Sequence, residues 1–501
     1  MCNNRATKRV IRRIALFSMS KNYRYIVSFM ALFMSVLALS GCNKQEISVN
    51  LSTPNISTPY ISKQTISDQN VSGQNASKQK GSNLNISSTG VLPEYETTPF
   101  EKKHQVQETT IAVVGDLMFH NTQLIKAYDP QTKSFDFSTI FAFIKPYLQA
   151  PDLLFGNLET TFYGPYGSTT SMSDQNVYGY SGYPMFNTPD SALDSIKEAG
   201  FDFLSTANNH SLDKRLDGLL RTITQLDERG IQHTGTYSSI EEKKPFELTE
   251  SNGITFAVVN YTYATNGIIL RDEDMQLINT LNNYEQESIE QLYNDVDLAV
   301  KENTDFVIVM MHYGNEYKGF EDKTYQRAIT ENLLRHGADI VFGGHPHVLQ
   351  PIEIYTELDD IPFDEPKIVI YSLGNFLASQ RNVDKMGGNT DLGVVFHLYF
   401  KQIDALQPKI TGIGFIPTYT TWQTDTIMTI PINESFTWDN DEVYYYGKTM
   451  SSPLVLTDWD NKRILFAKNY TLNHLLTYEN EKSMLGEQYY DDGVYRYDLH
   501  Q

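Results

Sequence analysis

The chain has 501 residues and a formal net charge of −21, and 40% of its residues are hydrophobic. This length allows two or three domains with a large core. The acidic balance argues against nucleic acid or a bare anionic membrane as a partner, because both repel a negative protein.

The first 42 residues have the features of an export signal. Seven basic and no acidic residues are followed by an apolar run of 14 residues, 26–39, and by Leu-Ser-Gly-Cys ending at Cys42. Such a run is short for a bilayer span but suits a signal-peptide core. The ending resembles a bacterial lipobox, so we expect cleavage before Cys42, a lipid on its thiol and an extracytoplasmic protein anchored in the cell membrane. The alternative is an uncleaved anchor helix, and Met19 is an alternative start.

Residues 43–107 are predicted to form a flexible stalk. They are rich in Ser, Asn, Gln and Thr, and a five-residue pattern recurs over 55–79. Such a segment buries too little apolar surface to fold, and as a random coil it would extend on the order of 40–50 Å. Loss of the signal leaves 33 basic against 61 acidic residues, a net charge of −28. Because Cys2 leaves with the signal and Cys42 carries lipid, we expect no disulfide.

From residue 108 onward, apolar strand-like runs alternate with helical periods. We expect strands at 109–114, 153–155, 201–206, 255–261, 305–311, 340–342 and 367–372, and helices at 137–148, 191–199, 216–228, 286–302 and 325–336. This alternation indicates an α/β domain over residues 108–400. Residues 401–501 contain no recognisable motif, and 410–417 alternates like an edge strand. We expect them to form an appendage packed on the main domain.

Polar residues of metal-ligand type follow most of these strands. In open α/β sheets the functional site lies beyond the carboxyl ends of the strands. The sequence V-F-G-G-H-P-H places two imidazoles on a turn that Pro346 makes rigid, a common way to hold a transition-metal ion. The alternative is a pair of ordinary turn histidines. The candidate residues are Asp116, Glu159, Asn209, His210, His312, His345, His347 and Asn375.

Six motifs in a fixed order extend from about Ile111 to Phe376. They are V-V-G-D-L-M, G-N-L-E-T, A-N-N-H-S-L-D, M-H-Y-G-N-E-Y, G-G-H-P-H-V-L-Q-P and Y-S-L-G-N-F. On these motifs the chain resembles the CapA family of capsule or poly-γ-glutamate biosynthesis proteins, whose domain is similar to the calcineurin-like metallophosphoesterases. The resemblance implies a layered α/β/β/α sandwich with its site at the carboxyl ends of the strands.

The resemblance also implies roles for individual residues. His210 would meet the substrate and act in catalysis together with Asp116. Asp213, Glu316 and Asn375 would hold the ligands in place, although a surface role is the alternative for Asp213 and Glu316, and the role of Asn375 is open. Ligands of one or two divalent ions would be Asp116, Glu159, Asn209, His312, His345 and His347. Nitrogen and oxygen ligands without thiolates suit Mn, Fe or Zn.

Simpler interpretations exist for three of these residues. Asp116 could cap the following segment, Glu159 could start a helix, and His312 could be a core histidine. The sequence also departs from the phosphoesterase pattern Asp-x-His, because Met118 stands where the histidine is expected. One metal shell would then lack a ligand. His120 is a candidate substitute, but an exposed loop histidine is the preferred interpretation of that residue.

Two functions are compatible with these features. The first is a lipid-anchored, metal-dependent hydrolase acting in the assembly of an envelope polymer. The second is a non-catalytic accessory subunit that binds or exports nascent anionic polymer, or holds together the membrane subunits of a polyglutamate synthase. Met118 favours the second and the otherwise full ligand set favours the first.

Overall fold

Two β-sheets lie face to face at the centre of the described chain. The computed structural model describes residues 104–173, 175–381, 388–434, 436–439, 442–445, 448–449, 454–478 and 484–500. They all belong to one of the chain's two compact units, Thr98–Gln501. The predicted signal peptide, Cys42 and all but the last residues of the predicted stalk lie outside the described residues. Within the described part, no helix is both long and apolar enough to cross a bilayer.

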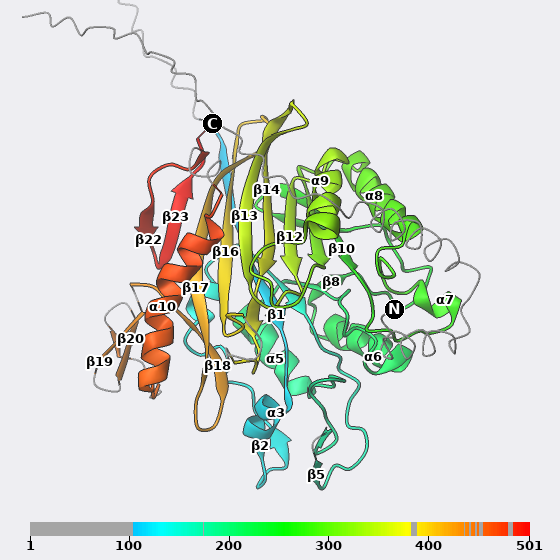
Figure 1. Ribbon diagram of the computed structural model, residues 1–501, viewed down its shortest axis with the longest axis vertical. Helices are drawn as coiled ribbons and strands as arrows, with labels where there is room; N and C mark the ends of the chain where they lie inside the picture. The colour runs from blue at the N-terminus through cyan, green and yellow to red at the C-terminus, as the bar shows by residue number, and fades with distance from the viewer. Residues whose placement is uncertain are drawn as a thin grey trace, which may run out of the picture. The chain divides into compact units, whose positions relative to one another are not determined.

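The first sheet has the order β22-β23-β17-β16-β1-β4-β7-β8, with β15 beside β1 and β18 beside β17 (Figure 1). Strands β1, β4, β7 and β8 run parallel, and β16 and β17 continue the sheet antiparallel. The strands are β1 (Val106–Leu117), β4 (Leu153–Leu158), β7 (Phe203–Ser205), β8 (Gln232–Thr234), β15 (Asn375–Leu377), β16 (Leu392–Ile403), β17 (Lys409–Trp422), β18 (Ile427–Pro431), β22 (Tyr489–Asp491) and β23 (Val494–Asp498).

The second sheet has the order β13-β14-β12-β11-β10-β9. Its four central strands, β14, β12, β11 and β10, are parallel, and β13 and β9 flank them antiparallel. The strands are β9 (Glu247–Ser251), β10 (Ile254–Thr262), β11 (Phe306–His312), β12 (Ile340–Gly344), β13 (Leu349–Leu358) and β14 (Ile361–Leu373).

The alternation of side chains along the strands builds three apolar layers. Val113 belongs to the cluster between the sheets, whereas its neighbours Ala112 and Val114 belong to the cluster under the first pair of helices. Those helices are α5 (Asp190–Ala199) and α6 (Arg215–Glu228). Helices α8 (Gln286–Lys301) and α9 (Ala328–Arg335) cover the outer face of the second sheet. Successive side chains of a strand point to opposite faces of the sheet, so each sheet packs against the other sheet on one face and against helices on the other. The predicted layered α/β/β/α sandwich is therefore confirmed.

The predicted helix over 137–148 is largely absent. The chain forms successive turns, such as Ile140 N–H to Phe137 O at 3.2 Å, and only α4 (Lys145–Leu148) is helical. Pro146 lies in the first turn of α4, where a proline is tolerated, and it has no N–H to donate to the Ala142 carbonyl, so the helix does not extend further toward residue 137. Other short elements are α3 (Asn121–Ala127), β2 (Tyr128–Asp129), β3 (Ser134–Phe135), β5 (Met172–Ser173), β6 (Asn176–Val177), α7 (Asp272–Met275) and the π-helix η2 (Lys323–Arg327).

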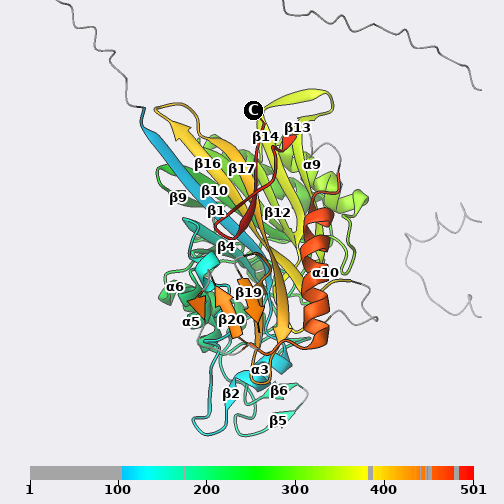
Figure 2. The same cartoon turned by 90° about the vertical axis from the view of Figure 1, so that its left-hand side faces the viewer.

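The structure corrects the prediction that residues 401–501 are an appendage. The boundary at residue 400 falls inside β16, and β17 is an interior strand paired with β16, β18 and β23. The edge-strand interpretation was wrong because Ile413 and Phe415 pack into the core between the sheets. Figure 2 shows helix α10 (Asp458–Leu475) lying along this side of the molecule. A small sheet comprises β19 (Phe436–Asp439), β20 (Glu442–Tyr445) and β21 (Lys448–Thr449).

Candidate metal centre

The carboxyl ends of parallel strands from both sheets meet at one place. Asp116 near the end of β1 pairs in register with Asn157 near the end of β4. In the second sheet, His312 at the end of β11 is in register with Gly344 at the end of β12. Because the two sheets pack face to face, the side chains at these strand ends lie close to one another.

The turn after β12 is held in an unusual backbone conformation. His345 has φ 93° and His347 has φ 57°, the left-handed region that side chains other than glycine rarely adopt. Such conformations cost about 1–3 kcal/mol each and are concentrated at functional sites. Gly344 is required for the close approach, because a Cβ there would lie 2.8 Å from Asp116 Oδ1.

Hydrogen bonds connect residues from five strand ends. Asn157 Nδ2 donates to Asp116 Oδ1 at 2.7 Å, and His347 Nδ1 lies 3.1 Å from Asp116 Oδ2. His312 Nε2 lies 2.9 Å from Asn209 Oδ1. These residues are all buried. Asn157 Nδ2 also lies 3.1 Å from His312 Nδ1, so four of the six predicted ligands lie in one hydrogen-bonded cluster although they are far apart in sequence: Asp116, Asn209, His312 and His347.

Glu159 lies at the centre of this cluster. Its side chain is 0% exposed, and among the described residues neither carboxylate oxygen has a hydrogen-bond partner. Three imidazole nitrogens surround Oε1, at 3.6 Å (His312 Nε2), 3.8 Å (His347 Nε2) and 3.9 Å (His210 Nε2). Burial, followed by the nearby charge of Asp116, raises the pKa of Glu159 well above its usual value. A buried carboxylate without a partner is costly unless a cation compensates it.

The donor set fits a divalent ion. Two groups could each hold one, Asp116 with Glu159 and His312, and Glu316 with His345 and His347, since the ligand atoms within each group lie within 4.8 Å of one another. Burial, followed by neighbouring histidines, lowers the pKa of His312 and of His345 well below the ordinary value, so both imidazoles are neutral at pH 7. Neutral imidazoles keep a lone pair for a metal. His345 Nδ1 is also buried without a partner in the described part of the chain.

A family model described as bacterial capsule synthesis protein PGA_cap matches residues 110–380. The chain belongs to this family. It is 28% identical over 282 residues to the capsule biosynthesis protein CapA of Bacillus anthracis, covering 56% of this chain and 62% of that protein, which is less than two thirds of its length. It is 25% identical over 285 residues to the PGA biosynthesis protein CapA of Bacillus subtilis (strain 168), covering 56% and 67%.

Among solved structures, the chain is similar to a calcineurin-like phosphoesterase, YfkN from Bacillus subtilis. The identity is 12%, the TM-score is 0.29, and the alignment covers 74% of this chain and 99% of the other. So low a TM-score decides nothing, and the assignment of the fold in this PGA_cap protein rests on its own sheet order and layers.

His210 borders the cluster and is oriented by a carboxylate. Its Nδ1 lies 2.8 Å from Asp213 Oδ2, which also accepts the backbone N–H of Phe186 at 2.7 Å. The Phe186 ring packs edge-on against the imidazole with centroids 4.7 Å apart. Nε2 consequently points toward Glu159. Asp213 therefore contacts His210 directly and orients its ring.

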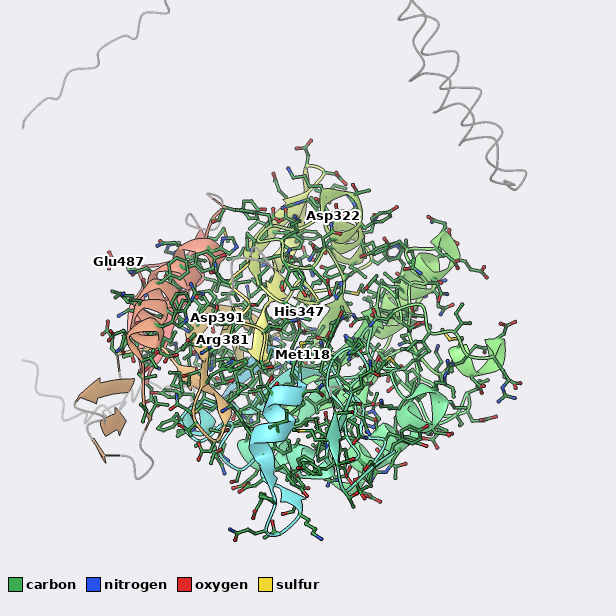
Figure 3. All side chains as sticks on the ribbon, turned by 60° about the horizontal axis from the view of Figure 1, so that its bottom comes forward. Met118, Asp322, His347, Arg381, Asp391 and Glu487 are labelled. Atoms are coloured by element: carbon green, nitrogen blue, oxygen red, sulfur yellow. The ribbon has the colours of Figure 1, made fainter. Side chains whose placement is uncertain are left out.

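Met118 and His120 both lie apart from the ligand groups. Met118, labelled in Figure 3, is 1% exposed and packs in an apolar cluster with Phe186 and Ala378. His120 was expected in an exposed loop, but burial lowers its pKa to about 3, and its ring packs against Phe186 with centroids 5.2 Å apart. Neither carboxylate–histidine group found among the described residues includes His120. Met118 therefore supplies no metal ligand at the position where the resemblance implied a histidine.

The remaining predicted residues differ in their distance from the cluster centre. Asn375 Oδ1 lies 3.0 Å from His347 Nδ1, so Asn375 contacts a candidate ligand directly. Glu316 Oε1 lies 4.0 Å from His347 Nε2, and its side chain is 46% exposed, which places it at the opening of the site. Sequence reasoning missed Asn157, whose amide contacts both Asp116 and His312. Its position in the G-N-L-E-T motif was the available signal.

Proposed function

We propose that this PGA_cap protein is a divalent-metal-dependent hydrolase of the phosphoesterase type that acts in the assembly of a capsule polymer. The observation that carries the proposal is Glu159, a buried carboxylate with two unpartnered oxygens inside a ring of three imidazole nitrogens at 3.6–3.9 Å. The residues that would hold one or two ions are Asp116, Glu159, Asn209, His312, His345 and His347. Mn, Fe and Zn suit this donor set.

When bound, a divalent ion supplies Lewis-acid polarisation of a phosphoryl or carbonyl oxygen and activates water for attack. The chain's own residues position the other reactants. Asn157 holds Asp116 Oδ1 through its 2.7 Å hydrogen bond, and the His345 backbone N–H at 3.3 Å and His347 Nδ1 at 3.1 Å contact Oδ2. His210 would act as the general acid in its doubly protonated form, in which Asp213 at 2.8 Å accepts the Nδ1 proton and the Nε2–H faces the cluster and passes its proton to the leaving group.

The names of the relatives support a place in capsule or poly-γ-glutamate biosynthesis, and we extend that role to this chain. A lipid on Cys42 would fix the protein to the outer side of the cell membrane, beside the membrane subunits of a polymer synthase. Cys42→Ala should then release the protein from the membrane fraction or block processing. An unchanged mass and full membrane retention of this variant would refute the anchor.

Metal analysis combined with hydrolysis assays tests the enzymatic role. Purified protein loaded with Mn²⁺, Zn²⁺ or Mg²⁺ should hydrolyse p-nitrophenyl phosphate or bis-p-nitrophenyl phosphate, and chelation should abolish the activity. His210→Gln should keep the metal content while lowering kcat about 10²–10⁴-fold, the usual contribution of a positioned proton donor. Retention of full kcat by this variant would refute the role of His210.

The second candidate is a non-catalytic accessory subunit that binds nascent anionic polymer. Met118 favours it, because this buried apolar side chain occupies the position of an expected ligand. Under this alternative the protein binds divalent metal with the same residues but hydrolyses neither ester. Polymer retention on the metal-loaded protein, lost in the chelated form, would then be the observable activity.

A further inference from the structure

Helix α10 contains a buried arginine that reaches toward the candidate metal centre. The helix lies outside the family match of residues 110–380 and packs against β17 and β13. Arg463 forms a two-pronged ion pair with Asp391, Nε to Oδ2 at 2.9 Å and Nη2 to Oδ1 at 2.6 Å, and Nη2 also donates to Asn389 Oδ1 at 3.2 Å. The two charged side chains are 9% and 5% exposed. A buried ion pair of this kind adds little to the net free energy of unfolding, which points to a role in fixing the geometry of its neighbours.

The residue between these two partners contacts the site. The Thr390 carbonyl accepts a hydrogen bond from Asn375 Nδ2 at 2.8 Å, and the same nitrogen donates to Gln380 Oε1 at 2.9 Å. With its two N–H groups used in this way, the Asn375 amide must turn Oδ1 toward His347 Nδ1, 3.0 Å away. The opposite orientation would set Oδ1 against two other oxygens.

This orientation contributes to the choice of which nitrogen of His347 carries the proton. Two oxygen acceptors, Asn375 Oδ1 at 3.0 Å and Asp116 Oδ2 at 3.1 Å, together select the tautomer with hydrogen on Nδ1. Nε2 then keeps its lone pair, and this nitrogen lies 3.8 Å from Glu159 Oε1 and 4.0 Å from Glu316 Oε1. It is therefore the atom available to an ion. Figure 3 labels His347 and Asp391, which lie near the two ends of this path.

We propose that Arg463 is a positioning residue of the metal centre. Through the segment Asn389–Asp391 it fixes the amide of Asn375, and Asn375, together with Asp116, holds the proton on Nδ1 of His347 and orients the ring. This inference deepens the proposed function, since the ion would bind at Nε2. The tautomer itself is a property of the metal-free chain, so it can be tested separately.

The last turn of α10 holds the other side of the site. His474 Nε2 lies 2.7 Å from the Gly319 carbonyl and 3.0 Å from the Leu349 carbonyl. Gly319 follows the segment that carries Glu316 and Tyr317, and the Tyr317 N–H donates to the Pro346 carbonyl at 2.8 Å. One helix thus contacts both of the loops beside His347, as a positioning element requires.

Two measurements on the full chain test this proposal. Histidine ¹⁵N NMR of the metal-free protein reports the His347 tautomer, and Co²⁺ binding with its visible spectrum reports the affinity and geometry of the centre. Arg463→Ala should loosen one of the two acceptors at Nδ1, move the His347 ¹⁵N shifts toward those of the other tautomer and give about 10–100-fold weaker Co²⁺ binding, the usual effect of losing a residue that orients a ligand. Arg463→Lys should be intermediate, because lysine cannot form the two-pronged pair.

The matched control is Lys468→Ala on the same helix, a partly exposed residue whose ion-pair partner is Glu434, at 3.3 Å, and not a residue of the segment Asn389–Asp391. It should match the wild type in both measurements. If Arg463→Ala does not fold, Asp391→Asn weakens the same pair with little change in shape and should give the same shifts. Loss of thermal stability with an unchanged tautomer and unchanged Co²⁺ affinity would overturn the proposal. A wild-type chain that binds no divalent ion would refute the proposed function, while the tautomer comparison would still decide the role of Arg463.

Discussion

Glu159→Gln should change the stability of the protein in opposite directions with and without a divalent ion. In the metal-free chain this carboxylate is fully buried and its oxygens have no hydrogen-bond partner among the described residues. An unpaired buried polar group costs about 1–3 kcal/mol, and more when it is charged. Removing the charge should therefore stabilise the metal-free protein by on the order of 1–3 kcal/mol.

The stabilisation of the metal-free protein by Glu159→Gln should depend on pH. Burial raises the pKa of Glu159 well above 4.5, so the metal-free folded state binds a proton that the unfolded state has released. The contribution of Glu159 to the free energy of unfolding is then fully present below pH 4.5 and is lost as the pH rises through the folded-state pKa. The stabilisation by Glu159→Gln should accordingly increase with pH above about 4.5 and be absent below it.

With a divalent ion bound, Glu159→Gln should destabilise the protein instead of stabilising it. An ion that binds only the folded state adds RT ln(1 + [L]/Kd), about 2.7 kcal/mol at a concentration of 100 Kd. Loss of a central ligand should remove most of this gain. Urea denaturation of wild type and variant at pH 7.5, with EDTA or with saturating Mn²⁺, measures both signs in one experiment.

Glu321→Gln is a matched control, because Glu321 is also buried but has partners. Its Oε1 accepts from Arg327 Nη2 at 2.7 Å and from the Tyr478 hydroxyl at 2.8 Å. This control should destabilise the protein equally with EDTA and with Mn²⁺. If Glu159→Gln destabilises the metal-free protein as well, Glu159 is an ordinary structural carboxylate and the metal-site reasoning fails.

Three further perturbations should have distinct outcomes. His345→Ala combined with His347→Ala should lower metal content measured by elemental analysis and leave the circular dichroism spectrum unchanged, because the strands beneath are apolar; an unchanged metal content would contradict the site. Gly344→Ala should weaken Mn²⁺ binding measured by calorimetry, since its Cβ would approach Asp116 Oδ1 to 2.8 Å; wild-type affinity would show that this close approach is not needed. Burial lowers the pKa of His397 to about 4, so stability should fall by about 3 kcal/mol as the pH drops from 6.5 toward 4. His397→Gln should remove that loss in urea titrations, and an unchanged pH slope would refute the assignment.

The sequence predicted the sheets and the strand-end residues well because both depend on local patterns. Apolar runs such as 109–114 and 305–311 are too continuous for any other element, and polar residues at their ends mark the same edge of a parallel sheet. The motif order then indicated the layered fold. The predicted site residues lie together for this reason, without any long-range information.

What the sequence could not predict depends on contacts between distant segments. The role of β17 as an interior strand depends on pairing with β23, about 80 residues later, and no local pattern reports that pairing. Asn157 resembles any polar residue in a motif until its amide is seen between Asp116 and His312. Arg463 lies on a helix without a motif, and its connection to the site passes through three other segments.

The charge of the centre bears on the number of ions it needs. With Glu159 ionised, as a bound ion would require, the Asp116 and Glu159 carboxylates contribute two negative charges to the cluster, and Glu316 adds a third at the opening. One divalent ion would leave this set at −1, and two would bring it to +1. A protein of net charge −21 repels anionic polymers and phosphate esters at long range. Because an ion's own charge dominates the local field, an anionic substrate would be attracted only by the two-ion form, and the count of bound ions therefore discriminates between an active site for anions and a single structural ion.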